Sequence, residues 1–140
     1  MPSEKLNDFS PYLLHEKIFL TCRKAPDKTA LKSSEYADNF FTYKDIEKVT
    51  PRIASLLENK GVKLQGKVGL LAENRPEWGI AYLSILCAGG VVVPFDPALK
   101  PAELANLLKL SKINWLFISE KMSSQLGQTI DFTGNNIETI

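Results

Sequence analysis

Few side chains in this sequence of 140 residues have the type and spacing that nucleophilic or acid–base catalysis needs. His15 is the only histidine, and no serine, cysteine or carboxylate stands at a recognisable spacing from it. We interpret it as a surface or packing histidine. Cys22 and Cys87 lie far apart in apolar stretches without a metal-ligand or redox spacing, which predicts two buried free thiols.

Four polar residues follow apolar runs that we predict to be parallel strands: Glu73, Asn74, Arg75 and Asp96. Ligands of open α/β sheets usually bind outside the carboxyl ends of the strands, so a ligand role for these residues has to be considered. Helix capping by Asn74 together with Glu77, and an ion pair or solvation of Arg75, explain them more simply. We therefore assign no catalytic, cofactor-binding or metal-binding residue.

The motifs that hold phosphate groups on a helix N-terminus do not occur. Neither G-x-x-x-x-G-K-[ST] nor G-x-G-x-x-G is found, and the stretch 66–69 leads into a predicted strand rather than a helix. The turn at 73–76 has no glycine that would let the backbone approach a pyrophosphate closely. The sequence thus predicts no self-contained dinucleotide site.

Composition and charge narrow the classes of function. Seventeen Lys and Arg residues balance sixteen Asp and Glu residues, and no basic stripe that could neutralise nucleic-acid phosphates is visible. With 44% hydrophobic and 24% charged residues, the composition is that of a folded globular protein. The N-terminus does not resemble a signal peptide, and no apolar run is long enough to span a bilayer. We expect a soluble, cytoplasmic protein that does not bind nucleic acid.

The first part of the chain, residues 1–65, is predicted to contain a helix, a hairpin and a second helix. Ser10 and Pro11 are suited to the N-cap and first position of a helix over about 11–24, in which apolar residues recur every four positions. Two short strand-like runs, separated by a polar turn, then predict a β-hairpin over 29–33 and 40–42.

The second helix has clear signals at both ends. Thr42 and Asp45 form a capping-box pair at its start, and Gly61 is placed to end it in a left-handed conformation. Pro51 lies inside the apolar pattern and cannot donate to the helical ladder, so we expect a kink or a break near Thr50.

Residues 66–120 alternate between strand-like and helix-like patterns. The apolar runs are typical of buried parallel strands, and the segments between them carry helix start signals; Gly89 is placed to end the first helix. The fold class is therefore α/β, a parallel βαβαβ sheet with helices on both faces. The strands are predicted at about 67–72, 90–94 and 113–118, and the helices at 75–88 and 101–110.

The last segment, 121–140, is predicted to be polar and to end in the start of an unfinished strand at 137–140. The helix at 75–88 is apolar on nearly all sides, which is typical of a helix buried in a larger protein. We therefore expect a partial domain of a larger protein. We also expect a homo-oligomer, formed through a second apolar face of that helix or through an unpaired strand at the C-terminus. The alternative is a monomer in which the polar segment 121–136 folds back and covers the apolar surface.

Several stretches resemble the adenylate-forming superfamily, which includes acyl-CoA synthetases, luciferases and the adenylation domains of peptide synthetases. FTYKDI at 41–46 resembles its first core motif, and LCAGGVVVPFDP at 86–97 resembles its second, more specifically. AENRPEW at 72–78 is similar to the strand-to-helix turn of the fatty-acid-activating branch. PAEL at 101–104 is similar to the next helix start, although Lys100 stands where the family commonly has a capping Thr or Ser.

The resemblance implies the N-terminal segment of a long-chain fatty-acid CoA ligase. Such an enzyme would use ATP, Mg²⁺ and coenzyme A to convert a fatty acid, through an acyl-adenylate, to acyl-CoA, AMP and pyrophosphate. In the family's order its phosphate loop, acidic metal ligand and catalytic lysine lie beyond residue 140. The resemblance therefore implies that residues 1–140 act with the remainder of a parent synthetase and are inactive alone. The alternative is a stand-alone binding or regulatory module that keeps the family scaffold.

Overall fold

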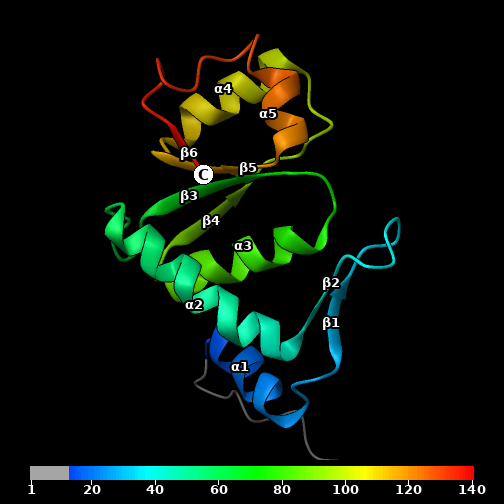
Figure 1. The fold of residues 1–140 in the computed structure, drawn as a ribbon. Coiled ribbons are helices and arrows are strands. Elements are labelled where there is room, and N and C mark those ends of the chain that lie inside the picture. The colour runs from blue at the N-terminus through cyan, green and yellow to red at the C-terminus, as the bar shows by residue number, and fades with distance from the viewer. Residues whose placement is uncertain (1–12) are drawn as a thin grey trace, which may run out of the picture.

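The computed structural model describes residues 13–140, so the predicted helix start at Ser10 and Pro11 lies outside the described residues. The first helix, α1 (Leu14–Lys24), is followed by the hairpin of β1 (Thr29–Lys32) and β2 (Phe40–Thr42). The two strands pair antiparallel, which confirms the predicted hairpin. In Figure 1 α1 and the hairpin lie together, away from the main sheet.

The capping box predicted for the second helix is present. The backbone N–H of Thr42 donates to Oδ2 of Asp45 at 2.8 Å, and the N–H of Asp45 donates to Oγ1 of Thr42 at 3.2 Å. These bonds satisfy two backbone donors that a helix start otherwise leaves free. The helix, α2, runs over Tyr43–Asn59, and Gly61 follows it with φ of 96°, as predicted.

No break interrupts α2 at its proline, so that part of the prediction is wrong. Pro51 is exposed within a continuous helix, so its ring removes one bond from the helical ladder without ending the helix. Its neighbour Thr50 points inward instead. The Thr50 side chain is fully buried, and its hydroxyl has no hydrogen-bond partner within the described residues.

Replacing Thr50 with valine is expected to stabilise the protein by about 1 kcal/mol, because it removes a buried polar group without a partner and preserves the shape of the side chain. Urea unfolding of the two proteins measures the change. Thr21→Val, at an exposed position of α1, is the matched control and should change stability by less than about 0.5 kcal/mol. A loss of stability in Thr50→Val would show that the hydroxyl is satisfied in solution.

The main sheet has four strands in the order β4-β3-β5-β6. Each neighbouring pair is parallel, which confirms the predicted βαβαβ unit and its α/β class. In Figure 1 α2 and α3 cover one face of the sheet, and α4 and α5 cover the other. The bounds are β3 (Lys67–Leu71), α3 (Pro76–Cys87), β4 (Val91–Pro94), α4 (Pro101–Ser111), β5 (Trp115–Ile118), α5 (Glu120–Leu126) and β6 (Glu138–Thr139).

The apolar helix α3 has no exposed residue, so the prediction that its second face would be open is wrong. One side packs on the sheet, where Ile85 contacts a cluster with Leu57 and Val68. The other side places Ile80 and Leu83 in a cluster with Cys22 of α1 and residues of α2. The N-terminal helices therefore cover the face that the sequence pattern left without a partner.

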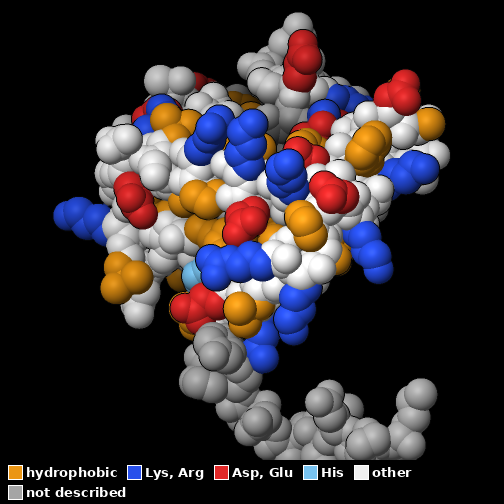
Figure 2. Space-filling model, turned by 60° about the horizontal axis from the view of Figure 1, so that its bottom comes forward, with side chains coloured by type: hydrophobic (Ala, Val, Ile, Leu, Met, Phe, Trp, Pro, Cys, Tyr) orange, Lys and Arg blue, Asp and Glu red, His pale blue; other side chains and the backbone are white. Residues whose placement is uncertain are grey.

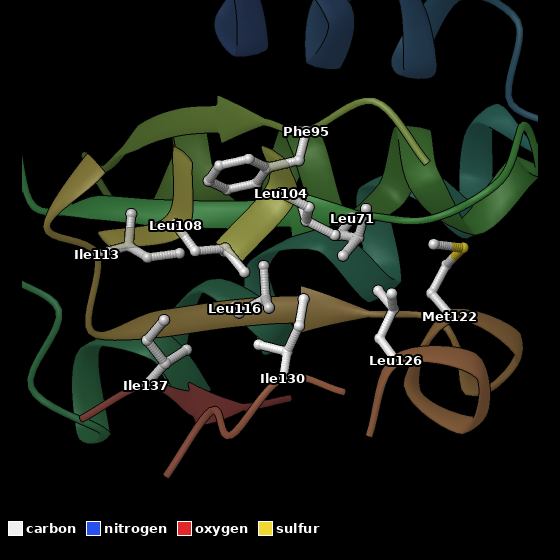
Figure 3. Packing of buried hydrophobic residues seen from close by; sticks show 10 residues of the cluster. All are labelled: Leu71, Phe95, Leu104, Leu108, Ile113, Leu116, Met122, Leu126, Ile130 and Ile137. Atoms are coloured by element: carbon white, nitrogen blue, oxygen red, sulfur yellow. The ribbon is translucent and has the colours of Figure 1, made fainter. Parts of the chain in front are cut away.

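The opposite face of the sheet carries the largest core cluster. Leu116 lies at its centre in Figure 3, fully buried between α4 on one side and the C-terminal segment on the other. The prediction that the C-terminal strand is unpaired is wrong here, because Glu138 of β6 lies beside Trp115 of β5. The polar segment before it contains α5, which was not predicted from the sequence. Ile137 is buried in this cluster and anchors β6.

Both cysteines are free thiols. Cys22 is buried as predicted, whereas Cys87 is half-buried, and burial raises the pKa of the Cys87 thiol to about 11. At that pKa the thiol is protonated at neutral pH, which makes it a poor nucleophile and metal ligand.

The surface mixes charges of both signs on the face drawn in Figure 2, where lysine and arginine side chains are interspersed with aspartate and glutamate. Among residues 13–140, no helix is long and apolar enough to cross a membrane. The expected homo-oligomer stays a prediction. Its remaining structural basis is the outer edge of β6, since α3 is covered.

Candidate functional site

The connections of the sheet reverse direction between β3 and β5. After β3 the chain crosses through α3 to β4 on one side, and after β5 it crosses through α5 to β6 on the other. The helices α3 and α5 lie on opposite faces of the sheet (Figure 1), and a crevice lined by residues 70–81 and 117–120 opens outside the carboxyl ends of the two strands. Such a switch point is where open α/β sheets usually bind ligands.

A hydrogen bond bridges this crevice. Ser119, the residue after β5, donates from Oγ to Oε2 of Glu73, two residues after β3, at 2.5 Å. The same Ser119 oxygen accepts the backbone N–H of Met122 at 3.2 Å and so caps α5. Ser119 thus connects the two loops and fixes the start of the following helix.

Arg75 joins a second carboxylate to this bridge. Its Nε lies 2.9 Å from Oε2 of Glu77, and one terminal nitrogen lies 3.4 Å from Oε1 of Glu73. The predicted cap of α3 by Asn74 is wrong, because the N-cap is Arg75 and Pro76 occupies the first helical position. Glu77 is therefore free to pair with the Arg75 side chain.

The network shifts the pKa of each carboxyl that it contains. The Ser119 hydroxyl is the main cause that lowers the pKa of Glu73, and the hydrogen bond from Arg75 is the main cause that lowers that of Glu77. Both carboxylates also raise the pKa of Arg75. All three groups are held charged at neutral pH, which suits ion pairing and excludes them as general acids near pH 7.

A pocket of about 250 Å³ opens beside the network. Its interior is apolar, with Ala81 of α3 at the wall, and the aromatic rings of Trp78 and Phe117 line it. Arg75 and Glu120 stand among its polar lining residues. The combination of an apolar interior, few polar groups and shifted pKa values is typical of a ligand pocket.

The other residues considered from the sequence lie elsewhere. Asp96 accepts the backbone N–H of Ala98 at 2.8 Å and shapes the turn after β4. Asn74 is exposed, and His15 makes an edge contact with the ring of Phe19. Within residues 13–140 no group of three or more His, Cys, Asp or Glu side chains could hold a metal ion. Sequence reasoning missed Ser119, whose signal was a serine directly after an apolar run and before a helix.

Replacing Ser119 with alanine is expected to lower the free energy of unfolding by about 1 kcal/mol through the lost cap. It should also raise the pKa of Glu73 towards its ordinary value. A carboxyl with a lowered folded-state pKa stabilises the protein above its unfolded pKa, and this contribution is lost as pH falls through the folded pKa. The variant should therefore lose less stability than the wild type on acidification.

Carbon-detected NMR of the Glu73 carboxyl, with urea unfolding across the acid range, measures both effects. Ser123→Ala, at an exposed position of α5, is the control and should leave the Glu73 pKa unchanged. An unchanged pKa in Ser119→Ala would contradict the bridge across the crevice.

Comparison with known proteins identifies the scaffold. The family described as AMP-binding enzyme matches residues 18–137, which is most of the chain. The chain belongs to the AMP-binding enzyme family. The two core motifs at 41–46 and 86–97 fall inside the matched range, so the adenylate-forming resemblance is confirmed at the level of the family.

Curated relatives of this AMP-binding chain are large synthases. Tyrocidine synthase 3 of Brevibacillus parabrevis is 34% identical over 84% of the chain, and the polyketide synthase PksN of Bacillus subtilis is 28% identical over 91%. The chain spans only 2% of the length of each.

Solved structures share the fold. The nonribosomal peptide synthetase FmoA3 bound to α-methyl-L-serine-AMP superposes with a TM-score of 0.79 at 26% identity, over 92% of this chain and 14% of that one. The anthranilate CoA ligase AuaEII, in complex with anthranoyl-AMP, gives the same TM-score at 22% identity. At that identity the likeness to AuaEII shows the fold alone; it covers 97% of this chain and 26% of that one.

Proposed function

We propose that residues 1–140 form the N-terminal scaffold of an enzyme that activates a carboxylic acid with ATP to give an acyl-adenylate and pyrophosphate. The observation that carries this proposal is the AMP-binding family match over 18–137. The fold agrees with it, since the main sheet superposes on a synthetase whose solved structure contains an aminoacyl-AMP. In this proposal α1, the hairpin and the four-stranded sheet supply a folded base for later segments.

The identity of the carboxylic acid, and of the molecule that accepts the acyl group, has to be proposed separately. A fatty acid and coenzyme A are supported by the turn AENRPEW at 72–78, which resembles the fatty-acid-activating branch. An amino acid is supported by the curated relatives, because tyrocidine synthase 3 and bacitracin synthase 3 are peptide synthases at 34% and 33% identity. We favour the acid:CoA ligase as the proposal and keep the adenylation domain of a peptide synthetase as the second candidate.

The residues of the crevice do not fit ATP and Mg²⁺, the cofactors that the family implies. Its rim contains more carboxylates than cations, which disfavours a triphosphate. Pro76 removes a backbone N–H at the start of α3, where a phosphate would need donors. We therefore derive no catalytic step from residues 13–140, and nucleotide binding in the proposal belongs to other parts of the protein.

The isolated chain of 140 residues is accordingly expected not to bind Mg-ATP and to form no adenylate. Calorimetric titration with Mg-ATP, and a pyrophosphate-release assay with a fatty acid, measure the two activities. Micromolar binding or release of pyrophosphate would contradict the assignment of these residues as a scaffold. The same titration tests the alternative of a stand-alone regulatory module, because a module that senses ATP would bind Mg-ATP.

Two assays on the complete gene product distinguish an acid:CoA ligase from the adenylation domain of a peptide synthetase. An acid:CoA ligase should convert a fatty acid, ATP and coenzyme A to acyl-CoA, with AMP released only when all three are present. A peptide synthetase domain should exchange pyrophosphate into ATP with an amino acid, independently of coenzyme A. Amino-acid-dependent exchange without thioester formation would replace our favoured candidate by the second.

A further inference from the structure

The crevice between β3 and β5 has a net negative rim. Two carboxylates line it, those of Glu77 and Glu120, and a third, that of Glu73, is joined to it through Ser119 and Arg75. The cations that act on them are Arg75, which pairs with the first two, and Lys121, which contributes to the electrostatics of Glu73. An excess of one carboxylate attracts a positively charged group and repels an anion.

Glu120 is the carboxylate available to a ligand. Glu73 and Glu77 are held by Ser119 and Arg75 within the network. The side chain of Glu120 makes no hydrogen bond or ion pair with the rest of residues 13–140, and Glu120 lines the pocket from the first turn of α5. The bonds of Glu73 and Glu77 fix the shape of the rim. The carboxylate of Glu120 stays exposed to a ligand that enters the pocket.

The interior beneath this rim is suited to an aromatic ring of a ligand rather than to a polar ligand. Leu70, Ala72 and Ala81 form apolar surface there, and the rings of Trp78 and Phe117 stand at its walls. Aromatic walls favour planar ligands, and a tryptophan also attracts cations through the face of its ring. A volume of about 250 Å³ lies just below the range of pockets for drug-sized ligands, so the ligand is small.

We propose that this crevice binds a small arylalkylamine, with the aromatic ring between Trp78 and Phe117 and the ammonium group beside Glu120. The site is separate from the proposed activation of a carboxylic acid and needs neither ATP nor any segment beyond residue 140. It rests on three features of the described residues: the switch point, the apolar pocket and the charge of the rim.

The test is an NMR titration of the chain with three probes of similar size: benzylamine, benzyl alcohol and benzoate. Backbone amide signals of residues 73–77 and 119–121 report binding at the crevice. Benzylamine is expected to bind with a Kd of about 1 mM, as is usual for so few atoms. Benzyl alcohol should bind about threefold more weakly, and benzoate more weakly still, because only the amine gains from the negative rim.

Two variants localise the binding. Ala81→Leu fills the pocket and should weaken benzylamine at least about tenfold, with a thermal melt to verify that the variant is folded. Glu120→Gln alters an exposed side chain and should weaken benzylamine about threefold without changing benzyl alcohol. Glu103→Gln, an exposed carboxylate on α4, is the matched control and should leave all three probes unchanged.

Absence of shifts at the crevice up to about 20 mM benzylamine, well above the expected Kd, would overturn the site. Benzoate binding as tightly as benzylamine would overturn the assignment of a cationic ligand. Shifts that persist in a folded Ala81→Leu variant would place the ligand elsewhere and equally overturn the proposal. None of these outcomes depends on adenylate formation, so they leave the proposed function to its own assays.

Discussion

Replacing Leu116 with alanine is expected to lower the free energy of unfolding by about 4 kcal/mol. Leu116 is fully buried on the central strand β5, and it lies between α4 and the C-terminal segment in the cluster of Figure 3. Removing its three outer carbons forfeits their transfer free energy and leaves a cavity that a parallel sheet cannot close easily. This is a large fraction of the stability of an ordinary domain of this size.

Urea unfolding followed by far-ultraviolet circular dichroism measures the loss. Leu107→Ala removes the same atoms from a side chain of α4 that is 43% exposed, and it should cost under about 1 kcal/mol. Equal costs at the two positions would contradict the position of Leu116 at the centre of the core.

The second large effect is a coupling between Leu116 and Gly69. A β-carbon added at Gly69, on the neighbouring strand β3, would lie 2.7 Å from Cδ1 of Leu116 and 2.5 Å from Cδ1 of Ile113. Both of these side chains are buried and have little room to move. Gly69→Ala is therefore expected to cost about 2 kcal/mol through overpacking.

In the Leu116→Ala background the same glycine substitution should cost about 1 kcal/mol less, because its methyl group enters the space that the leucine has left. A double-mutant cycle of urea unfolding measures this coupling. Leu20→Ala, at an exposed position of α1 on the far side of α2 and α3 from the Leu116 cluster (Figure 1), serves as an uncoupled partner for Leu116→Ala. Strict additivity of Gly69→Ala with Leu116→Ala would contradict the packing of β3 against β5.

Local signals in the sequence predicted the middle of the fold well, and their physics explains why. The capping pair of Thr42 and Asp45, and the glycines at 61 and 89, act through bonds and backbone angles within a few residues of themselves. The parallel strands were predicted because strands covered on both faces by helices produce continuous apolar runs. These features do not depend on contacts with distant segments of the chain.

Elements whose partners come from distant segments were predicted less well. The second face of α3 was expected to be open, since nothing within 75–88 reveals that α1 and α2 cover it. The helix α5 is only seven residues long, too short to give a clear period, and β6 has only two residues, flanked by the buried Ile137 and the partly buried Ile140. Pro51 was given too much weight, because one lost bond on an exposed side does not end a helix that is packed on its other side.

The candidate site was predicted in part for the same reason. The sequence placed Glu73 and Arg75 at the carboxyl edge of the sheet, but it assigned the cap of α3 one residue too early. Ser119 was missed because its bond to Glu73 joins residues 46 positions apart and exists only once β3 and β5 are paired. The resemblance gave the family correctly, whereas the choice of a fatty acid and coenzyme A stays a prediction.

Exchange of radiolabelled pyrophosphate into ATP by the complete gene product tests the central claim most directly. The assay requires only the first half-reaction, so it reports carboxylate activation whatever the later acceptor is. We predict exchange that depends on Mg²⁺ and on an added carboxylic acid, and that is absent from residues 1–140 alone. A folded complete protein that shows no exchange with any fatty, aromatic or amino acid would contradict the proposal that this scaffold belongs to a carboxylate-activating enzyme.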